Sequence, residues 1–118
     1  MYGGSYDQRP GVPVDAVLLG AAMHLDTGPL AAGKLVYSRG CVLLGWSFRE
    51  RAGTPALAQA DLLDGGSAGG ELVVPFSIAA SGTQEAPASW PGIQVKSGLY
   101  LNVIAGTLGG VLFIVPEQ

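Results

Sequence analysis

Charged side chains are scarce in this chain. Asp, Glu, Lys and Arg together make up 13% of the residues, about half of the usual share in a globular domain. The six Lys and Arg residues are spread along the sequence, and the formal net charge is −3. Because nucleic-acid binding relies on clustered basic side chains, we expect no nucleic-acid partner. Such a weakly charged surface also favours a protein that is partly covered by other subunits.

Cysteine and histidine occur once each. Cys41 has no second cysteine for an intramolecular disulfide, and we expect it to be either a small core residue or an inert, half-exposed thiol. His24 and Asp26 would share one face of a strand, but two side chains do not complete a metal site. The sequence therefore predicts no metal and no cofactor.

Catalytic signatures are also weak. No glycine-rich segment has the spacing of a phosphate-binding loop, because the glycine pairs lie between predicted strands. Carboxylates that could pair as in a glycosidase, Asp61 with Asp64 or Glu50 with Glu71, lie at strand ends and turns. Solubilising and turn-forming roles explain these positions better. We predict that the protein is not an enzyme.

Apolar runs of membrane-spanning length are missing as well. Asp15, His24 or glycines interrupt the longest apolar stretches, so we expect no transmembrane helix and no membrane partner. The N-terminal residues do not combine a basic region with an apolar core, and we therefore expect no signal peptide.

Residues 1–13 differ in composition from the rest of the sequence. Residues 1–13 are rich in glycine and proline, contain tyrosines and follow no periodicity. A frayed terminus would explain them, but a tyrosine buries a large flat surface at low entropic cost. We predict an extended N-terminal arm in which Tyr2, Tyr6 and Arg9 contact either another chain or the arm's own domain.

Residues 14–118 are predicted to form one domain of about eight short strands, since apolar runs alternate with Gly, Pro, Asp and Ser at a spacing of roughly ten residues. Pro75 indicates an edge position for its strand. Residues 55–63 could instead form a helical turn, and the polar residues 83–91 are expected to form a loop. The expected strands are 14–19 with 21–25 (one strand if Gly20 is a bulge), 34–38, 41–50, 57–63, 71–78, 93–96, 99–105 and 111–115.

Many short strands without helical periodicity are typical of a β-sandwich or a small barrel, and not of βαβ units. We predict an all-β fold: a single-domain antiparallel β-sandwich that is jelly-roll-like.

The most apolar segment, residues 99–115, is predicted to close the domain as an antiparallel hairpin with a glycine-rich hinge at 106–110. One face of this hairpin would belong to the core. The other would be covered by a second subunit or by the second sheet of the sandwich. Alternation divides the first strand into Leu99, Leu101 and Val103 on one face and Tyr100 and Ile104 on the other.

The aromatic residues suggest different roles. Trp46 and Phe48 share a face of a central strand, and we expect Trp46 to pack in the core. Trp90, between Ser89 and Pro91, is predicted to be available at the surface, either in an interface or as a loop anchor. Together with Tyr100, Trp90 could also belong to a sugar-binding platform.

Four segments follow one another in a familiar order. They are Gly-Trp-Ser-Phe-Arg-Glu at 45–50, an Ala-rich strand ending in Asp64-Gly65, Gly-Ile-Gln-Val-Lys-Ser-Gly-Leu-Tyr-Leu-Asn-Val from Gly92, and a final Gly-Val-Leu-Phe-Ile-Val. Over about residues 33–116 the chain resembles the small β-rich accessory structural proteins of tailed bacteriophages. The resemblance implies a non-enzymatic β-sandwich that binds an assembled shell or tube, often as a trimer on capsids.

We therefore expect a capsid decoration or accessory protein that binds and stabilises the assembled phage head as a homo-oligomer, a trimer. Its partner would be the major capsid protein or another virion protein, and its location the virion, assembled in the host cytoplasm. Two alternatives are a phage tail or fibre-base protein and a carbohydrate-binding β-sandwich module. The predicted contact residues are Tyr2, Tyr6, Arg9, Trp90, Tyr100 and Ile104.

Overall fold

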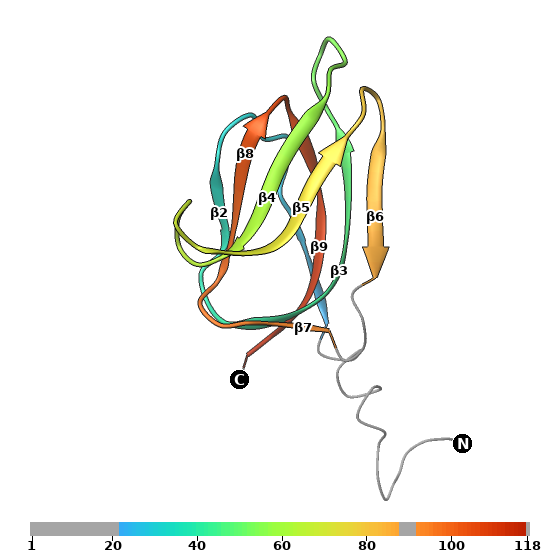
Figure 1. The fold of residues 1–118 in the computed structure, drawn as a ribbon. Helices are drawn as coiled ribbons and strands as arrows, with labels where there is room; N and C mark the ends of the chain where they lie inside the picture. The colour runs from blue at the N-terminus through green and yellow to red at the C-terminus, as the bar shows by residue number, and fades with distance from the viewer. Residues whose placement is uncertain (1–21, 88–91, 118) are drawn as a thin grey trace, which may run out of the picture.

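The computed structural model describes residues 22–87 and 92–117 (Figure 1). Within these residues the chain forms nine β-strands and no helix, which confirms the all-β class. The strands are β1 (Met23–Asp26), β2 (Lys34–Tyr37), β3 (Cys41–Glu50), β4 (Ala58–Asp64), β5 (Glu71–Ile78), β6 (Thr83–Pro87), β7 (Ile93–Val95), β8 (Leu99–Ala105) and β9 (Leu108–Pro116).

Two antiparallel sheets form the two layers of a sandwich (Figure 1). Sheet A has the order β1-β9-β3-β6, with β7 also paired to β3, and sheet B has the order β2-β8-β4-β5. The first strand thus pairs with the last, β2 with β8, β3 with β6 and β4 with β5. This wrapping of nested pairs is a jelly roll, as predicted. The predicted arm, residues 1–13, lies outside the described residues.

The core lies between the sheets and is filled by alternate side chains of both. An aromatic cluster joins the layers: Phe76 of sheet B lies 4.8 Å from Phe48 and 6.2 Å from Trp46 of sheet A, measured between ring centroids. Phe48 is only 1% exposed, and Cys41 is fully buried in the same core. The expectation that Cys41 is a core residue is confirmed.

A β-bulge in β3 decides which of its side chains reach the core. Leu44 is an extra residue, because Leu43 and Gly45 pair with consecutive residues of β9. The bulge shifts the alternation by one residue, so Leu43 faces the core before it, and Trp46 and Phe48 face the core after it. The predicted shared face of Trp46 and Phe48 is confirmed.

The two C-terminal strands do not form the predicted hairpin. β8 lies in sheet B and β9 in sheet A, so the turn at Gly106 takes the chain from one sheet to the other. Gly106 has a φ of 71°, and a Cβ at this position would collide with the carbonyl oxygen of Leu57. A hairpin and a crossover both place glycine between apolar strands, and the pattern alone does not distinguish them.

Other boundaries also differ from the prediction. Residues 83–87, expected in a loop, form edge strand β6, because the long β3 offers partners for its backbone although its own side chains are polar. Residues 58–64 form a strand, so the helical alternative for 55–63 is wrong. β1 begins at Met23, and the predicted strand 14–19 lies outside the described residues.

β5 is an edge strand of sheet B, as Pro75 predicted. Gln84 of β6 covers part of its free side. The backbone N–H of Ser77 donates to Oε1 of Gln84 over 3.1 Å, and Nε2 of Gln84 donates to the carbonyl oxygen of Pro75 over 3.4 Å. One side-chain amide thus satisfies a donor and an acceptor of this edge, as a neighbouring strand would.

Candidate functional site

An apolar row crosses the outer face of sheet B. Leu35 of β2 pairs with Tyr100 of β8, Tyr100 pairs with Leu63 of β4, and Leu63 pairs with Leu72 of β5. Residues paired in this way project from the same face of a sheet. Since Leu62, the neighbour of Leu63, is fully buried in the core, the row faces outward. We call these four residues the sheet B row.

The row is buried in the middle and exposed at both ends. Leu63 is 6% exposed although it does not belong to the core cluster, whereas Leu35 is 42% and Leu72 is 56% exposed. Ile104, further along β8 on the same face, is 59% exposed. Apolar side chains that gather on one exposed face indicate a contact surface.

Opposite charges lie at the two edges of sheet B, on the face opposite to the row, because Lys34 pairs with the buried Leu101 and Glu71 pairs with Asp64. Lys34 immediately precedes Leu35 on β2, Glu71 immediately precedes Leu72 on β5, and both charged residues are exposed. Nζ of Lys34 donates a long hydrogen bond of 3.5 Å to the carbonyl oxygen of Thr27. One edge of sheet B is therefore basic and the other acidic, and the two edges are complementary to each other.

Two of the predicted contact residues lie on this face. Tyr100 is half-buried in the row, and its hydroxyl lies against Gly33, where a side chain would collide with it. Ile104 projects from the same side, so the alternative in which the second sheet covers Tyr100 and Ile104 is wrong; that sheet packs against the buried Leu99 side. The remaining predicted contacts, Tyr2, Tyr6, Arg9 and Trp90, lie outside the described residues.

Sequence reasoning missed the other members of the row. Leu35, Leu63 and Leu72 lie on three different strands, and only the pairing of these strands with β8 and β4 brings them together. No local pattern in the sequence marks these three leucines as members of one surface.

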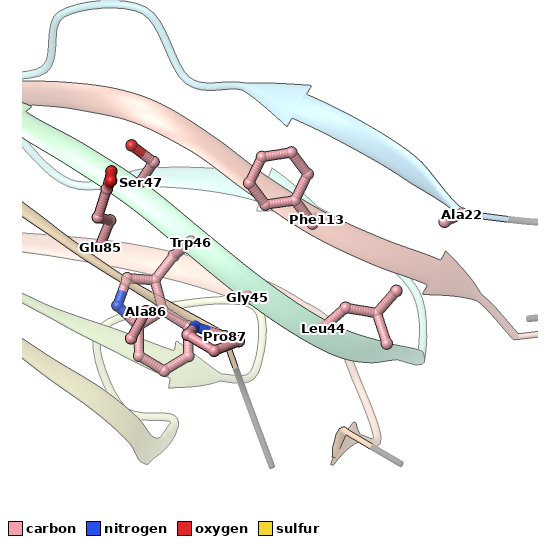
Figure 2. A pocket seen from close by; sticks show the side chains of 9 residues that line it. All are labelled: Ala22, Leu44, Gly45, Trp46, Ser47, Glu85, Ala86, Pro87 and Phe113. Atoms are coloured by element: carbon pink, nitrogen blue, oxygen red, sulfur yellow. The ribbon is translucent and has the colours of Figure 1, made fainter. Parts of the chain in front are cut away.

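A hollow of about 700 Å³ lies over sheet A (Figure 2). Phe113 of β9, Gly45 of β3 and Pro87 of β6 are neighbours in the strand register, and Gly45 contributes no side chain between the other two. Phe113 is 42% exposed. The residues that line this hollow, called here the sheet A groove, are Ala22, Leu44, Gly45, Trp46, Ser47, Glu85, Ala86, Pro87 and Phe113.

The sheet A groove is mainly apolar. Ser47 and Glu85, which pair across β3 and β6, supply its polar side chains. The Trp46 indole lies on the other side of β3 from the Ser47 side chain (Figure 2). Its Nε1 is buried and has no hydrogen-bond partner in the part of the chain that the structure describes. Trp46 is thus held by packing against Phe76 and not by a polar contact.

Two of the four carboxylates considered as catalytic pairs, Glu50 and Asp64, bind backbone groups of loops. Glu50, 7% exposed, accepts hydrogen bonds from the backbone N–H groups of Ser81 and Ala52, each over 2.7 Å. These bonds lower the pKa of Glu50, although desolvation opposes them. Asp64 accepts from the backbone N–H groups of Lys96 and Ser97 over 2.9 Å each. Both carboxylates fix the conformation of neighbouring turns.

The single thiol is shielded. Burial, together with the negative charges of Asp64 and Glu117, raises the pKa of Cys41 to about 11. Since the thiolate is the nucleophilic form, Cys41 is an unreactive core residue at neutral pH.

One motif escaped the sequence analysis. Residues 65–69 have the spacing G-x-S-x-G of a hydrolase nucleophile elbow. That motif requires a turn from a strand into a helix, whereas here it lies in the hairpin loop between β4 and β5. The hydroxyl of Ser67 accepts a hydrogen bond from the backbone N–H of Gly69 over 3.3 Å. The segment is therefore a glycine-rich turn.

Within residues 22–87 and 92–117, no three His, Cys, Asp or Glu side chains gather as a metal site would require. No helix of the described chain is long and apolar enough to cross a membrane.

Comparison with known proteins identifies no relative of this chain. No family model matches the sequence, no curated protein is significantly similar to it, and no solved structure matches it. The class that fold and surfaces define is a jelly roll with an apolar row on one outer face and an apolar groove on the other.

Proposed function

We propose that this protein is a non-enzymatic structural component of a phage virion, a capsid decoration or accessory protein that binds and stabilises the assembled head as a homotrimer. The jelly roll occurs in viral capsid proteins, but also in lectins and cupins, so the fold supports the proposal without deciding it. The resemblance of residues 33–116 to accessory virion proteins adds further support.

The sheet B row is the main support. Its exposed ends, Leu35 beside Lys34 and Leu72 beside Glu71, lie at opposite edges of one sheet. If the β5 edge of one copy meets the β2 edge of the next, Leu72 can contact Leu35 on one face of the joined sheets, and Glu71 can pair with Lys34 on the other face. A head-to-tail contact of this kind closes into a ring when the rotation between copies is suitable, and a three-fold ring is the arrangement that we propose.

Charge reversal tests the contact between copies. We expect Lys34→Glu and Glu71→Lys each to convert the trimer into monomers, because each change places like charges across the interface. The double variant restores opposite charges and should restore the trimer. Mass measured by light scattering or ultracentrifugation at low salt reports these states. Arg49→Glu with Glu85→Lys on sheet A is the matched control and should leave the trimer unchanged.

A monomeric wild-type protein at micromolar concentration, or single variants that remain trimeric, would contradict this arrangement. Recovery in the double variant separates an interface effect from misfolding, since both substitutions are then present in an assembled protein.

Binding to heads tests the virion role. The protein should co-sediment with purified heads of a phage whose genome encodes it, and Trp90→Ala should still bind. Labelling along the tail axis would instead place it in the tail or fibre base. Glycan-array binding that Trp90→Ala abolishes, with no co-sedimentation, would favour the carbohydrate-binding alternative.

A further inference from the structure

Strand β6 has an unpaired margin. It is the last strand of sheet A, and among the described residues only β3 pairs with it. The margins of sheet B are interrupted, because Gln84 binds backbone groups of β5 and a register shift breaks the regular pairing of β2. In the described chain β6 carries neither of these two features, which protect sheet edges against an added strand.

The register of β3 and β6 fixes which backbone groups lie on the free side. The backbone N–H of Glu50 donates to the carbonyl oxygen of Gly82 over 3.0 Å, and this pair continues the register of the two strands. Hydrogen-bonded pairs alternate along an antiparallel ladder. Gln84 therefore directs its N–H and C=O groups to β3, whereas Thr83 and Glu85 direct theirs to the free side.

The side chains at this margin determine which partner would fit. Glu85 is exposed and pairs with Ser47, so its carboxylate lies on the outer face of sheet A at the rim of the sheet A groove (Figure 2). Pro87, two residues further along β6, lines the same groove. A strand added to β6 would place one outward side chain beside each of these two residues. A basic side chain suits Glu85, and an apolar side chain suits Pro87.

A second copy of this chain is the less favourable occupant. If the β6 strands of two copies paired along their whole length in an antiparallel, two-fold arrangement, Glu85 of one copy would lie opposite Glu85 of the other. Like charges that face each other across two strands repel. The carboxylate thus opposes self-association by strand addition, and it attracts a partner of opposite charge.

We propose that the free margin of β6 binds an extended segment of a partner protein as an additional antiparallel strand of sheet A. A basic residue of the partner lies opposite Glu85, and an apolar residue lies beside Pro87. The antiparallel direction is chosen because it is slightly more stable per residue than the parallel one. Main-chain hydrogen bonds provide the affinity, and the charge and the groove provide the selectivity. This inference rests neither on the trimer nor on the virion role.

A synthetic peptide tests the margin directly. The lysine peptide is Thr-Leu-Val-Lys-Val-Leu-Thr, acetylated and amidated, in which the lysine and both leucines share one face of a strand. Amide hydrogen exchange, followed by nuclear magnetic resonance, should slow about ten-fold at Thr83 and Glu85 when the peptide is present at about ten times its Kd. Exchange at Gln84 and Ala86 should not change, because these residues already bond to β3.

Three outcomes of this measurement would overturn the proposal. The first is no protection of β6 amides at millimolar peptide, and the second is protection at another sheet margin instead. The third is protection of Thr83 and Glu85 that grows with protein concentration in the absence of peptide, which would assign the margin to a second copy of this chain.

Methylation of the peptide backbone distinguishes strand addition from apolar adhesion. In the antiparallel arrangement the backbone N–H of the peptide's lysine donates to the carbonyl oxygen of Glu85, whereas the N–H groups of its two valines point away. Methylation of the lysine backbone nitrogen should abolish binding. Methylation of a valine nitrogen is the matched control and should leave binding nearly unchanged. The reverse pattern, or equal effects at both positions, would contradict the proposed strand.

Charge reversal tests the role of Glu85. We expect Glu85→Lys to bind the lysine peptide about ten-fold more weakly, because an attractive pair becomes a repulsive one. A glutamate peptide, with glutamate in place of the lysine, should bind Glu85→Lys more tightly than wild type, so the test does not depend on a loss of binding alone. Equal affinity of wild type for the two peptides at low salt would overturn the proposed selectivity.

Discussion

Glu50 illustrates how a single carboxylate fixes local structure. It follows β3's exposed Arg49, but its side chain turns inward and binds two loops through Ser81 and Ala52. Ser81 has a φ of 59°, in the left-handed region that is unfavourable for a residue with a side chain. The hydrogen bond from the Ser81 backbone N–H to Glu50 helps to hold this strained turn.

We predict that Glu50→Gln lowers the melting temperature at pH 7. The pKa of Glu50 is lowered from 4.5 in the folded protein, so its ionised form contributes stability that is complete above about pH 4.5. This contribution is lost as the pH falls through the lower, folded-state pKa. The difference between wild type and variant should therefore shrink below pH 4.5, as followed by circular dichroism during heating.

Glu85→Gln is the control for this experiment, because Glu85 is exposed on β6. A melting difference between wild type and Glu50→Gln that stays constant from pH 7 to pH 3 would contradict the assignment.

Only some of the roles of single residues could be predicted from the sequence. The core positions of Cys41 and Trp46 followed from their apolar strand, and they were predicted correctly. The distant partners of Glu50 and Asp64 lie about 30 residues away, at separations of 31 for Ser81 and 32 for Lys96. No local pattern indicates such contacts, because they arise when two loops meet at one end of the sandwich.

Among the elements, β9 shows why glycine is needed inside a strand. A Cβ on Gly110 would collide with the carbonyl oxygen of Ser47 and lie 2.7 Å from the Cα of Phe48 on β3. On the other side, the buried Thr27 exchanges hydrogen bonds with the backbone of Gly110. The strand is therefore enclosed by backbone that cannot move aside.

We predict that Gly110→Ala lowers the free energy of unfolding by about 3 kcal/mol, the upper range for an overpacked core, because the colliding atoms belong to the backbone. Urea unfolding measures this change. Gly53→Ala is the matched control: no atom lies within 4 Å of its added Cβ, and the substitution should be neutral or slightly stabilising.

A loss of less than about 1 kcal/mol for Gly110→Ala would show that β3 and β9 can separate at this point. The strand pairing from Ser47 to Arg49 would then have to be looser than the structure indicates.

Strand boundaries were easier to predict than strand partners. The range 41–50 was predicted to the residue, and 99–105 as well. The hairpin between 99–105 and 111–115 was wrong, since each strand pairs with distant neighbours. Alternation reports which side chains share a face, but it contains no information about which strand lies alongside.

At the scale of the whole molecule, the nested pairs of the jelly roll join residues from both ends of the chain. His24 pairs with Phe113, and Leu35 with Tyr100. The all-β fold class and the approximate number of strands could be predicted from the spacing of turn residues and from the composition. The sheet B row and the sheet A groove could not, because each gathers residues from strands that become neighbours only in the folded sandwich.

We predict that this topology makes folding slow, in the range of about milliseconds to seconds, because distant segments must meet before the sheets are stabilised. Stopped-flow refolding of a Trp90→Phe variant, which leaves Trp46 as the tryptophan probe of the core, measures the rate. Refolding within microseconds would contradict the prediction. So would cooperative unfolding of a chain truncated after Gly106, which lacks β9 and hence the partner of both β1 and β3.

The amide of Gln84 has a consequence for what this protein becomes at high concentration. Because Gln84 occupies the hydrogen-bonding groups of Ser77 and Pro75, an incoming chain finds that part of the β5 margin already satisfied. Growth of an open-ended fibril by strand addition is blocked there. Copies that meet can then associate through side chains, in assemblies that stop growing once they close.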